Sequence, residues 1–535
     1  MEVLVGTSEI AMSHSRKFAL LTLVAFSHAD PYRPIVDPTR DDHELTKWLC
    51  GPSDPTPNTS TSCGPPNRQC VIDDVFSHDA DVNATCAPEG CHVCLHKELL
   101  PFAPTDYAGT ALLFLGGVMA GAAGIGGGGL NVPLLILVMG FVMEEAVPLS
   151  HVAVFGNSIA QNLVNLRRRH PLAPYRPMVD FDIPLLLLPA QLAGNSVGVL
   201  VGAIFPATVM VILACLLLLL ASSKTLLTGV KAYRRERAAA VDVALGAATI
   251  SDGFTDGASA SSSNPSLLAA APPLLSDVAV SSSAHSLAAA EEAASAASAV
   301  FHEKHESGGS GVGGMGAAAK VALLFGFFAL FILDSFAQKL LGGKTCSTGY
   351  WAWRVALYAA CAAAVGGGGW LALRTQAARA RAGTPQLSGD ITYTPKSLVA
   401  TPLLAVGVGV VAGLLGLGGG ELMAPLLLAL GMLPQVASAT SAFMIFFTSG
   451  ANLVTYLAQG VLTPDPGYVV WIVTLGFCSA MVGRLSSVFI TTRLRHPSFI
   501  VLTLGAILLV SMFLLIARVA QVEPQWAFSA LCPTD

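Results

Sequence analysis

Long apolar runs dominate the chain from residue 107 to residue 518. A helix that crosses a bilayer core needs about 20 apolar residues, so most of these runs are long enough to span a membrane. The runs at 130–143 and 421–433 are shorter and predict half-helices or re-entrant segments. The pattern predicts an all-α polytopic membrane protein with about twelve transmembrane segments, at 107–123, 130–143, 146–166, 181–203, 206–228, 318–341, 350–373, 398–415, 421–433, 435–460, 467–490 and 497–518.

The composition agrees with a membrane protein and excludes one class of partner. Hydrophobic residues make up 53% of the 535 residues and charged residues only 12%, whereas roughly a quarter of the residues of a soluble domain are charged. The 29 basic and 34 acidic residues nearly balance, giving a net charge of −5. Because no large basic surface follows from this balance, we expect no nucleic-acid binding.

The first 29 residues have the pattern of a secretory signal peptide. Arg16 and Lys17 precede a short apolar stretch that ends at Phe26, and small residues follow up to Ala29. The stretch is too short to span a bilayer, so we predict cleavage after Ala29. This signal places the chain in the plasma membrane or in an endomembrane of the secretory pathway.

Residues 30–104 predict a small extracytosolic domain rich in cysteine. Sequons at Asn58 and Asn83 predict glycosylation, and an even number of cysteines after a signal peptide favours disulfides, although six cysteines allow 15 connectivities. A zinc site is the less favoured alternative, formed by Cys91, His92, Cys94 and His96. The six cysteines are Cys50, Cys63, Cys70, Cys86, Cys91 and Cys94.

Basic residues in the loops predict the orientation of the helices. Cytoplasmic loops of membrane proteins are enriched in Lys and Arg, and with the amino-terminal domain outside every basic cluster falls inside. The carboxyl-terminal tail, 520–535, then lies outside, which Arg518 mildly contradicts. The clusters are Arg167–Arg169 with Arg176, Lys231–Arg237, Arg374–Arg381, and Arg493 with Arg495.

Two segments between the main blocks of apolar runs have their own character. Residues 238–316 consist almost entirely of Ala, Ser and Gly with scattered acids, a composition that predicts a disordered cytoplasmic linker. Residues 317–397 contain two apolar runs and a basic loop, which predict two extra transmembrane helices.

The chain contains an internal duplication. Residues 118–129 match 410–421, and the match extends to two further motifs downstream. The helix at 146–166 runs toward the cytoplasmic face, whereas its counterpart at 435–460 runs away from it. The duplication therefore predicts two inverted repeats of five segments each, 105–237 and 398–519. Inverted repeats with broken, Gly-rich short segments are typical of secondary transporters whose site lies between the repeats.

The Gly-rich blocks predict an anion site. Consecutive glycines break a helix and expose amide N–H groups, and helix amino-terminal ends stabilise negative charge. The alternative is that small residues only allow close helix packing. Arg484 either attracts the anion or extends toward the membrane surface. The predicted substrate-binding residues are Gly126, Gly127, Gly128, Ser150, Ser158, Asn162, Gly418, Gly419, Gly420, Thr440, Ser441, Thr448, Asn452 and Arg484.

The remaining charges within the apolar runs are few. Asp334 and Arg354 lie near the outer ends of adjacent runs, and we expect them to pair with each other. Glu421 is a candidate carrier of a coupling proton, or it lies at the outer interface. We predict no metal, no cofactor and no catalytic residue, because the runs contain no metalloprotease or nucleophile-base motif.

Several motifs resemble a known family. The segment Pro434–Ser441 with Phe443–Met444 closely resembles the signature of the sulfite exporter TauE/SafE family. Arg169–Pro171, Val179–Asp182 and Cys346–Trp351 resemble its eukaryotic branch. The resemblance covers about residues 107–518 and implies an anion transporter, usually an exporter, for sulfite, sulfoacetate or related sulfonates. The linker and the cysteine-rich domain have no counterpart in compact bacterial members.

The sequence thus favours a secondary transporter of a small sulfur-containing anion in a lipid bilayer. It contains no P-loop motif, so a primary pump would need a separate ATPase. The alternative function is a multipass receptor or scaffold whose cysteine-rich domain binds a partner, although a receptor needs no inverted repeat. A membrane enzyme ranks third.

Overall fold

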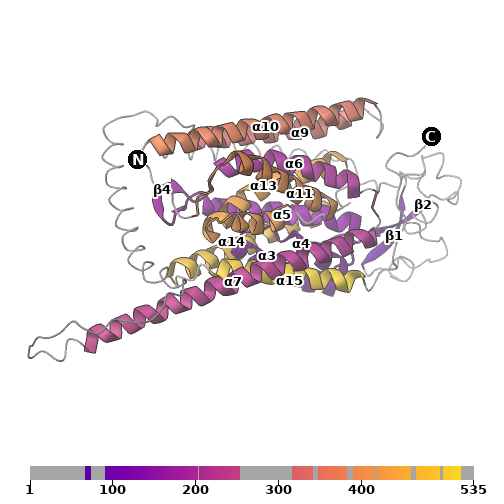
Figure 1. Ribbon diagram of the computed structural model, residues 1–535. Coiled ribbons are helices and arrows are strands. Elements are labelled where there is room, and N and C mark those ends of the chain that lie inside the picture. The colour runs from indigo at the N-terminus through magenta and orange to yellow at the C-terminus, as the bar shows by residue number, and fades with distance from the viewer. Residues whose placement is uncertain are drawn as a thin grey trace, which may run out of the picture.

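The computed structural model describes residues 67–73, 91–141, 143–202, 204–205, 207–252, 316–340, 348–381, 389–415, 419–459, 465–493 and 498–519. Within these residues the chain is a bundle of long helices with two small antiparallel sheets (Figure 1). The predicted signal peptide, both sequons and most of the predicted linker lie outside the described residues.

Each predicted apolar run coincides with one helix. The first repeat contains α3 (Pro104–Ala123), α4 (Gly128–Leu137), α5 (Met143–Asn165), α6 (Asp182–Gly202) and α7 (Ala207–Asp252). The two extra helices are α9 (Ala317–Leu340) and α10 (Thr348–Arg381). The second repeat contains α11 (Pro395–Leu415), α12 (Gly420–Ala429), α13 (Pro434–Gln459), α14 (Pro466–Arg493) and α15 (Ser498–Val519).

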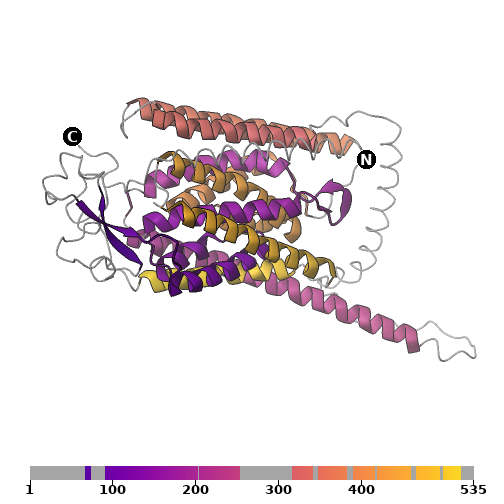
Figure 2. The same cartoon turned by 180° about the vertical axis from the view of Figure 1, so that it is seen from behind.

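The two sheets lie at opposite ends of the bundle, as Figure 2 shows from behind. Strands β1 (Arg68–Asp73) and β2 (Cys91–His96) pair at one end, and β3 (Arg169–His170) and β4 (Ala173–Pro177) pair at the other. The first sheet contacts the end of the α3–α4 hairpin, because Asn67 Nδ2 donates to the carbonyl of Met139 over 3.0 Å. The β1–β2 end and the β3–β4 end therefore give the bundle two distinguishable faces.

The cysteine-rich domain is described only at this sheet. Its register places Cys70 opposite Cys94, while the side chains of all six predicted disulfide cysteines lie outside the described ones. In the alternative zinc site, the His96 ring nitrogens lie 3.1 Å from the Lys97 carbonyl and 3.0 Å from the Met139 carbonyl. The disulfides stay a prediction.

Helix α4 is too short to cross a bilayer and folds back along α3. A Cβ on Gly116 would lie 3.5 Å from Leu130 and one on Gly127 would lie 2.9 Å from Ala120, so the two helices run antiparallel up to a tip at residues 124–127. Gly124 and Gly127 have φ of 82° and 76°, a left-handed conformation that favours glycine. The first Gly-rich block is therefore the tip of a helical hairpin that opens toward the β1–β2 end.

Helices of the two predicted repeats pack against each other. Helix α6 of the first repeat packs along α11 of the second, and α14 packs along α3. The backbones approach closely: a Cβ on Gly198 of α6 would overlap the Val410 carbonyl, and one on Gly483 of α14 would overlap the Val118 carbonyl. The packing alternative for small residues thus holds at these positions, which lie outside the Gly-rich hairpin tips.

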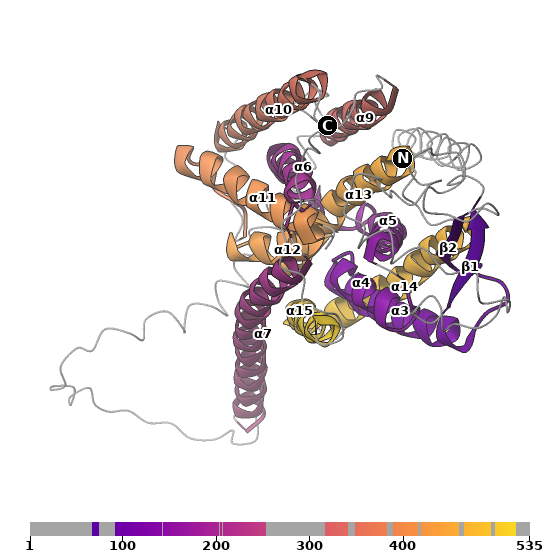
Figure 3. The same ribbon diagram turned by 90° about the vertical axis from the view of Figure 1, so that its right-hand side faces the viewer.

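Helices α5 and α13 occupy the middle of the bundle and contact each other, while α9 and α10 lie at its outside beside α13 and α6 (Figure 3). Helix α7 packs along α15 and extends far beyond the bundle at the β3–β4 end (Figure 1). It continues to Asp252, past the predicted start of the linker at residue 238. The Ala-rich sequence there has high helix propensity, which accounts for the continuation.

Among the described residues, seven helices are long and apolar enough to cross a membrane. They are α3, α6, α9, α10, α11, α13 and α14. Twelve membrane segments were predicted. Helices α4 and α12 are not among the seven because they have only ten residues each. Helix α5 is not among the seven because it contains polar residues, including His151, Asn157 and Gln161, that lower its mean hydropathy and are buried within the bundle. The described chain is thus an all-α membrane bundle apart from its two small sheets.

Candidate functional site

The tip of the first hairpin is held by polar side chains of α5. Gln161 Nε2 donates to the carbonyl of Ile125 over 3.0 Å, and Ser150 Oγ donates to the carbonyl of Gly128 over 3.3 Å. A Cβ on Gly126 would overlap Val154 of the same helix. The tip is therefore fixed against α5, and the amino-terminal end of α4, which favours negative charge, lies inside the bundle.

A fully buried arginine lies next to this tip. Arg484 of α14 is 0% exposed, so it does not extend to the membrane surface. Its Nε donates to Oδ1 of Asn165 over 2.6 Å, and one terminal nitrogen, Nη1, donates to Oγ of Ser438 over 2.9 Å. The other terminal nitrogen, Nη2, has no hydrogen-bond partner within the described residues.

The charge of Arg484 has no acidic counterpart among the described side chains. The ion pairs found there involve Asp106, Asp180, Asp182 and Asp390, and none includes Arg484. Its two partners are a neutral amide and a neutral hydroxyl. An unpaired buried cation is costly, and an anion placed at Nη2 would compensate that cost.

Ser438 connects the arginine to the hairpin. A Cβ on Gly124 would overlap the Ser438 hydroxyl, so the backbone of the tip lies directly against it. Ser438 is in the first turns of α13, which begins at Pro434. The structure thus brings together the hairpin tip, the amino-terminal end of α13 and a buried guanidinium, all of which stabilise negative charge.

Among the described residues, no arginine or lysine bonds to the amides beside the second hairpin. Gln191 Nε2 of α6 donates to the carbonyl of Gly419 over 2.9 Å, and Asn195 Nδ2 donates to Oδ1 of Asn452 over 2.8 Å. The buried ring of His151 lies 3.4 Å from Nδ2 of Asn452. This half of the bundle is polar but neutral in its described hydrogen bonds, so the two predicted half-sites are chemically different.

The other predicted site residues divide into those near the hairpins and those bonded within helices. Asn162 Nδ2 reaches the Ala442 carbonyl over 3.1 Å and so joins α5 to α13. Ser158 and Thr448 bond to carbonyls of their own helices, Phe155 and Ile445. Gly418 and the side chain of Glu421 lie outside the described positions, whereas Gly420 begins α12 and Ser441 is buried.

Three amides of α5 and one serine of α13 belong to this site but were not predicted. Asn157, Gln161 and Asn165 are spaced four residues apart, so they lie along one face of α5, and all three are buried. Three amides at helical spacing in an otherwise apolar run are visible in the sequence, and they could have predicted a polar face on this helix. Ser438 had a weaker signal, as one hydroxyl among several in its motif.

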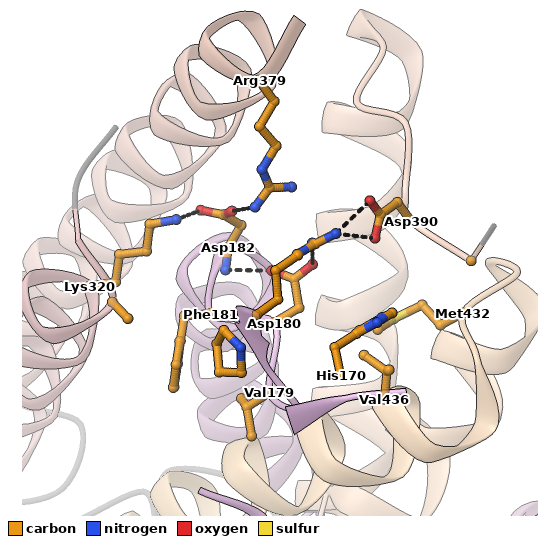
Figure 4. Close-up of a pocket in the computed structure, with 14 residues that line it drawn as sticks. His170, Val179, Asp180, Phe181, Asp182, Lys320, Arg379, Asp390, Met432 and Val436 are labelled. Atoms are coloured by element: carbon orange, nitrogen blue, oxygen red, sulfur yellow. Dashed lines mark hydrogen bonds and ion pairs between the residues drawn. The ribbon is translucent and has the colours of Figure 1, made fainter. Parts of the chain in front are cut away.

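A second charged site lies at the β3–β4 end, where a cavity of about 160 Å³ opens between the start of α6, α9, the end of α10 and the loop before α11 (Figure 4). Lys320 and Arg379 both bind the carboxylate of Asp182, the latter over 3.4 Å. Arg176 Nη1 donates to both carboxylate oxygens of Asp390, over 2.8 and 3.1 Å.

Two titratable groups of this cavity have shifted pKa values. Burial raises the pKa of Asp180, and the nearby charge of Asp182 raises it further, while Arg176 and Arg379 oppose the shift. Burial lowers the pKa of His170, as does the charge of Arg176, against an opposing effect of Asp390. The cavity therefore makes Asp180 easier to protonate, and His170 harder to protonate, than the same groups in water.

Of the outer charges, Arg354 donates from Nη1 to Ser196 Oγ over 2.6 Å and from Nε to Tyr350 OH over 3.3 Å. Asp334 is buried on α9. Their predicted pairing stays a prediction.

Comparison with known proteins identifies the family. Residues 109–332 and 401–532 match the family described as sulfite exporter TauE/SafE. The chain is 29% identical to sulfite exporter TauE/SafE family protein 3 of Arabidopsis thaliana, covering 75% of this chain and 76% of the relative. It is 25% identical to family protein 5 of the same plant, covering 82% and 92%. No solved structure matches.

The family match and the apolar helices together identify an integral, multi-pass membrane protein. The match also confirms the family expected from the motifs at Pro434–Ser441 and Val179–Asp182. This family is one of membrane transporters, which implies a small anion, such as sulfite or a related anion, as the substrate. The chain belongs to the sulfite exporter TauE/SafE family.

Proposed function

We propose that the protein is a secondary transporter that exports small sulfur-containing anions, such as sulfite or an organosulfonate. The observation that carries this proposal is Arg484, a fully buried guanidinium whose described contacts are neutral and whose Nη2 has no partner. A tetrahedral or pyramidal oxyanion accepts hydrogen bonds from such a group, from the Ser438 hydroxyl and from amides at the hairpin tip.

The surroundings favour a small substrate. A cavity beside α3 and α4, whose lining includes Asn131, Asn157 and Ser479, holds only about 10 Å³, about the space of one water molecule. The side chain of Arg484 is 0% exposed, so the proposed anion site is closed to both sides in this conformation. Transport then requires the hairpin tip to separate from α13 on one side at a time, as in alternating access between repeats.

We propose that the two repeats, 105–237 and 398–519, are related by an inverted duplication and that twelve segments enter the membrane, two of them as re-entrant short helices. Close contacts support this relationship. A Cβ on Gly198 would meet Val410 and Leu414, and one on Gly483 would meet Val118 and Ala122. Val118 is the counterpart of Val410 in the duplicated motif, so the same contact recurs in both halves.

The proposed orientation puts the β3–β4 end in the cytosol and the β1–β2 end outside. The arginines next to β3, at 167–169, support the first assignment. The cysteine-rich domain at 30–104 then lies outside, with glycans at Asn58 and Asn83 and with disulfides. The signal peptide at 1–29, the linker at 238–316 and the tail at 520–535 complete the proposed organisation, in the plasma membrane or an endomembrane.

Flux measurements on the full-length protein in proteoliposomes test the proposal. Labelled sulfite, sulfoacetate and sulfate are compared with chloride, in uptake and in counterflow, at a fixed pH. We expect saturable movement of at least one sulfur-containing anion in preference to chloride. Correctly folded protein that moves none of them, but binds a protein ligand through residues 30–104, would instead support a receptor.

A further inference from the structure

The charged cavity at the β3–β4 end is distinct from the Arg484 site. Figure 4 shows three carboxylates around it, Asp180, Asp182 and Asp390. They come from the start of α6 and from the loop before α11, so the cavity lies where the two repeats and the extra helices meet. A cavity of about 160 Å³ has room for several water molecules. The side chains of Asp180 and Asp390 are 17% and 13% exposed, so both carboxylates reach solvent.

Nearby cations stabilise the negative charges of the three carboxylates to different degrees. Asp182 binds two cations, Lys320 and Arg379. Asp390 receives two hydrogen bonds from Arg176 at 2.8 and 3.1 Å. Asp180 has its closest cation at 4.0 Å, where Arg176 Nη2 faces its Oδ2. Asp180 is therefore the carboxylate of this group whose negative charge is least stabilised.

The surroundings of Asp180 strengthen this difference. Its side chain is 17% exposed, its Oδ1 accepts the backbone N–H of Asp182 over 3.1 Å, and burial together with the charge of Asp182 raises its pKa. The charged and titratable groups around it are Asp182 of α6, Arg176 of β4, His170 of β3, Lys320 of α9, Arg379 of α10, and Asp390 and Tyr393 of the loop before α11.

Asp180 is also linked to the anion site through the backbone. Its N–H donates to Oγ1 of Thr440 over 3.2 Å. Thr440 lies two residues after Ser438, which binds Arg484. The first turns of α13 thus contact Asp180 on one side and the proposed substrate site on the other.

We propose that Asp180 binds and releases the proton that is coupled to anion transport, and that its charge sets how Arg176 is shared. When Asp180 is protonated, Arg176 binds Asp390 without competition from Asp180 and joins β4 to the loop before α11. When Asp180 is ionised, the two carboxylates compete for Arg176 and this connection weakens. The proton passes between the carboxylate and water in the cavity. This inference rests on the proposed transport function.

The test compares Asp180→Asn with Asp180→Glu and Asp390→Asn in proteoliposomes. Labelled sulfoacetate is the probe, because the charge of a sulfonate does not change near neutral pH, unlike that of sulfite. With the voltage clamped at zero, each coupled proton allows about tenfold accumulation for a gradient of about one pH unit. An internal pH dye records proton movement, and counterflow at equal pH reports transport without a driving gradient.

We expect wild-type protein and Asp180→Glu to accumulate the anion and move protons, the glutamate variant with a shifted pH profile. Asp390→Asn, which removes the carboxylate that competes for Arg176, should accumulate less of the anion. Asp180→Asn should keep counterflow but lose accumulation and proton movement. Accumulation by Asp180→Asn at the wild-type level overturns the proposal. So does wild-type protein that shows counterflow but moves no protons under a pH gradient, a result that leaves the transport function standing. Absence of counterflow in wild-type protein overturns the transport function itself. If the asparagine variant does not fold, an unshifted pH profile in Asp180→Glu overturns the proposal.

Discussion

Nη1 of Arg484 lies 2.9 Å from Oγ of Ser438, the same hydroxyl that lies against the backbone of Gly124 at the hairpin tip. One side chain thus separates a buried cation from the Gly-rich block. Any anion bound by the arginine is therefore close to the segment that must move during transport, which couples binding to the geometry of the hairpin.

Replacing Arg484 by alanine should weaken anion transport strongly. Hydrogen bonds to charged groups contribute about 1.5–3 kcal/mol, so the apparent affinity should fall by about tenfold to about a hundredfold. The measurement is the concentration dependence of sulfoacetate uptake. Arg374→Ala is the matched control, because Arg374 is exposed and stacks on Trp370 at 3.7 Å. Equal effects of both substitutions would contradict a role for Arg484 in binding.

Asn165→Asp should abolish transport without unfolding the protein. The substitution is isosteric and puts a carboxylate 2.6 Å from Nε of Arg484, where it would neutralise the buried cation in place of the substrate. The apparent Tm should rise while flux disappears. Ser438→Ala, which removes the hydrogen bond that the guanidinium donates to this hydroxyl, should reduce flux by about tenfold or more. Wild-type flux in Asn165→Asp would show that the charge of Arg484 is not used for the anion.

Gly127→Val should eliminate flux and leave membrane insertion intact. Gly127 has φ of 76°, which a β-branched residue rarely adopts, and a Cβ there would lie 2.9 Å from that of Ala120. Gly419→Val should be milder, because Gly419 has a φ of −45° and its Cβ would overlap a side-chain end, Nε2 of Gln191, and no backbone atom. Gly407→Val is the control, since a Cβ there meets nothing within 4 Å. Surface expression and flux are measured for each variant.

Asp180→Asn should raise the thermal stability in a pH-dependent way. Folding raises the pKa of Asp180 above its ordinary value of 3.8, so its ionised form costs stability. That cost is absent below 3.8, grows as the pH rises, and is complete above the raised value. The gain in apparent Tm from the substitution should follow the same curve. Asp390→Asn, which removes the partner of Arg176, should lower the Tm instead. A gain that grows toward acid pH would contradict this sign.

The proposed orientation predicts which segments are glycosylated outside and which are accessible to protease from the cytosol. Protein from a eukaryotic host should carry glycans that a glycosidase removes, and the combined Asn58→Gln and Asn83→Gln variant should lose the mass shift. A protease-sensitive tag near residue 280 should be cut only from the cytosolic side. A tag exposed at the opposite side would contradict the inverted repeats, because both conclusions depend on the same basic clusters.

The sequence by itself determined the features that depend on neighbours along the chain. The length of an apolar run decides whether a helix can form and how far it reaches, so the short segments at 130–143 and 421–433 were predicted, and they fold as α4 and α12. The glycines at 124 and 127 marked the hairpin tip, because only a local backbone requirement is involved. The family motifs are likewise contiguous and were readable directly.

Only the tertiary structure decided which distant side chains meet. Arg484 contacts Asn165 from 319 residues away, and from sequence alone it was equally compatible with extension to the membrane surface. Arg176 and Asp390 are 214 residues apart, and their pairing leaves Asp180 poorly compensated. Such pairings depend on how α14 packs along α5 and how the loop before α11 meets β4. They are fixed by helix packing across the two repeats, which no periodicity within a single segment specifies.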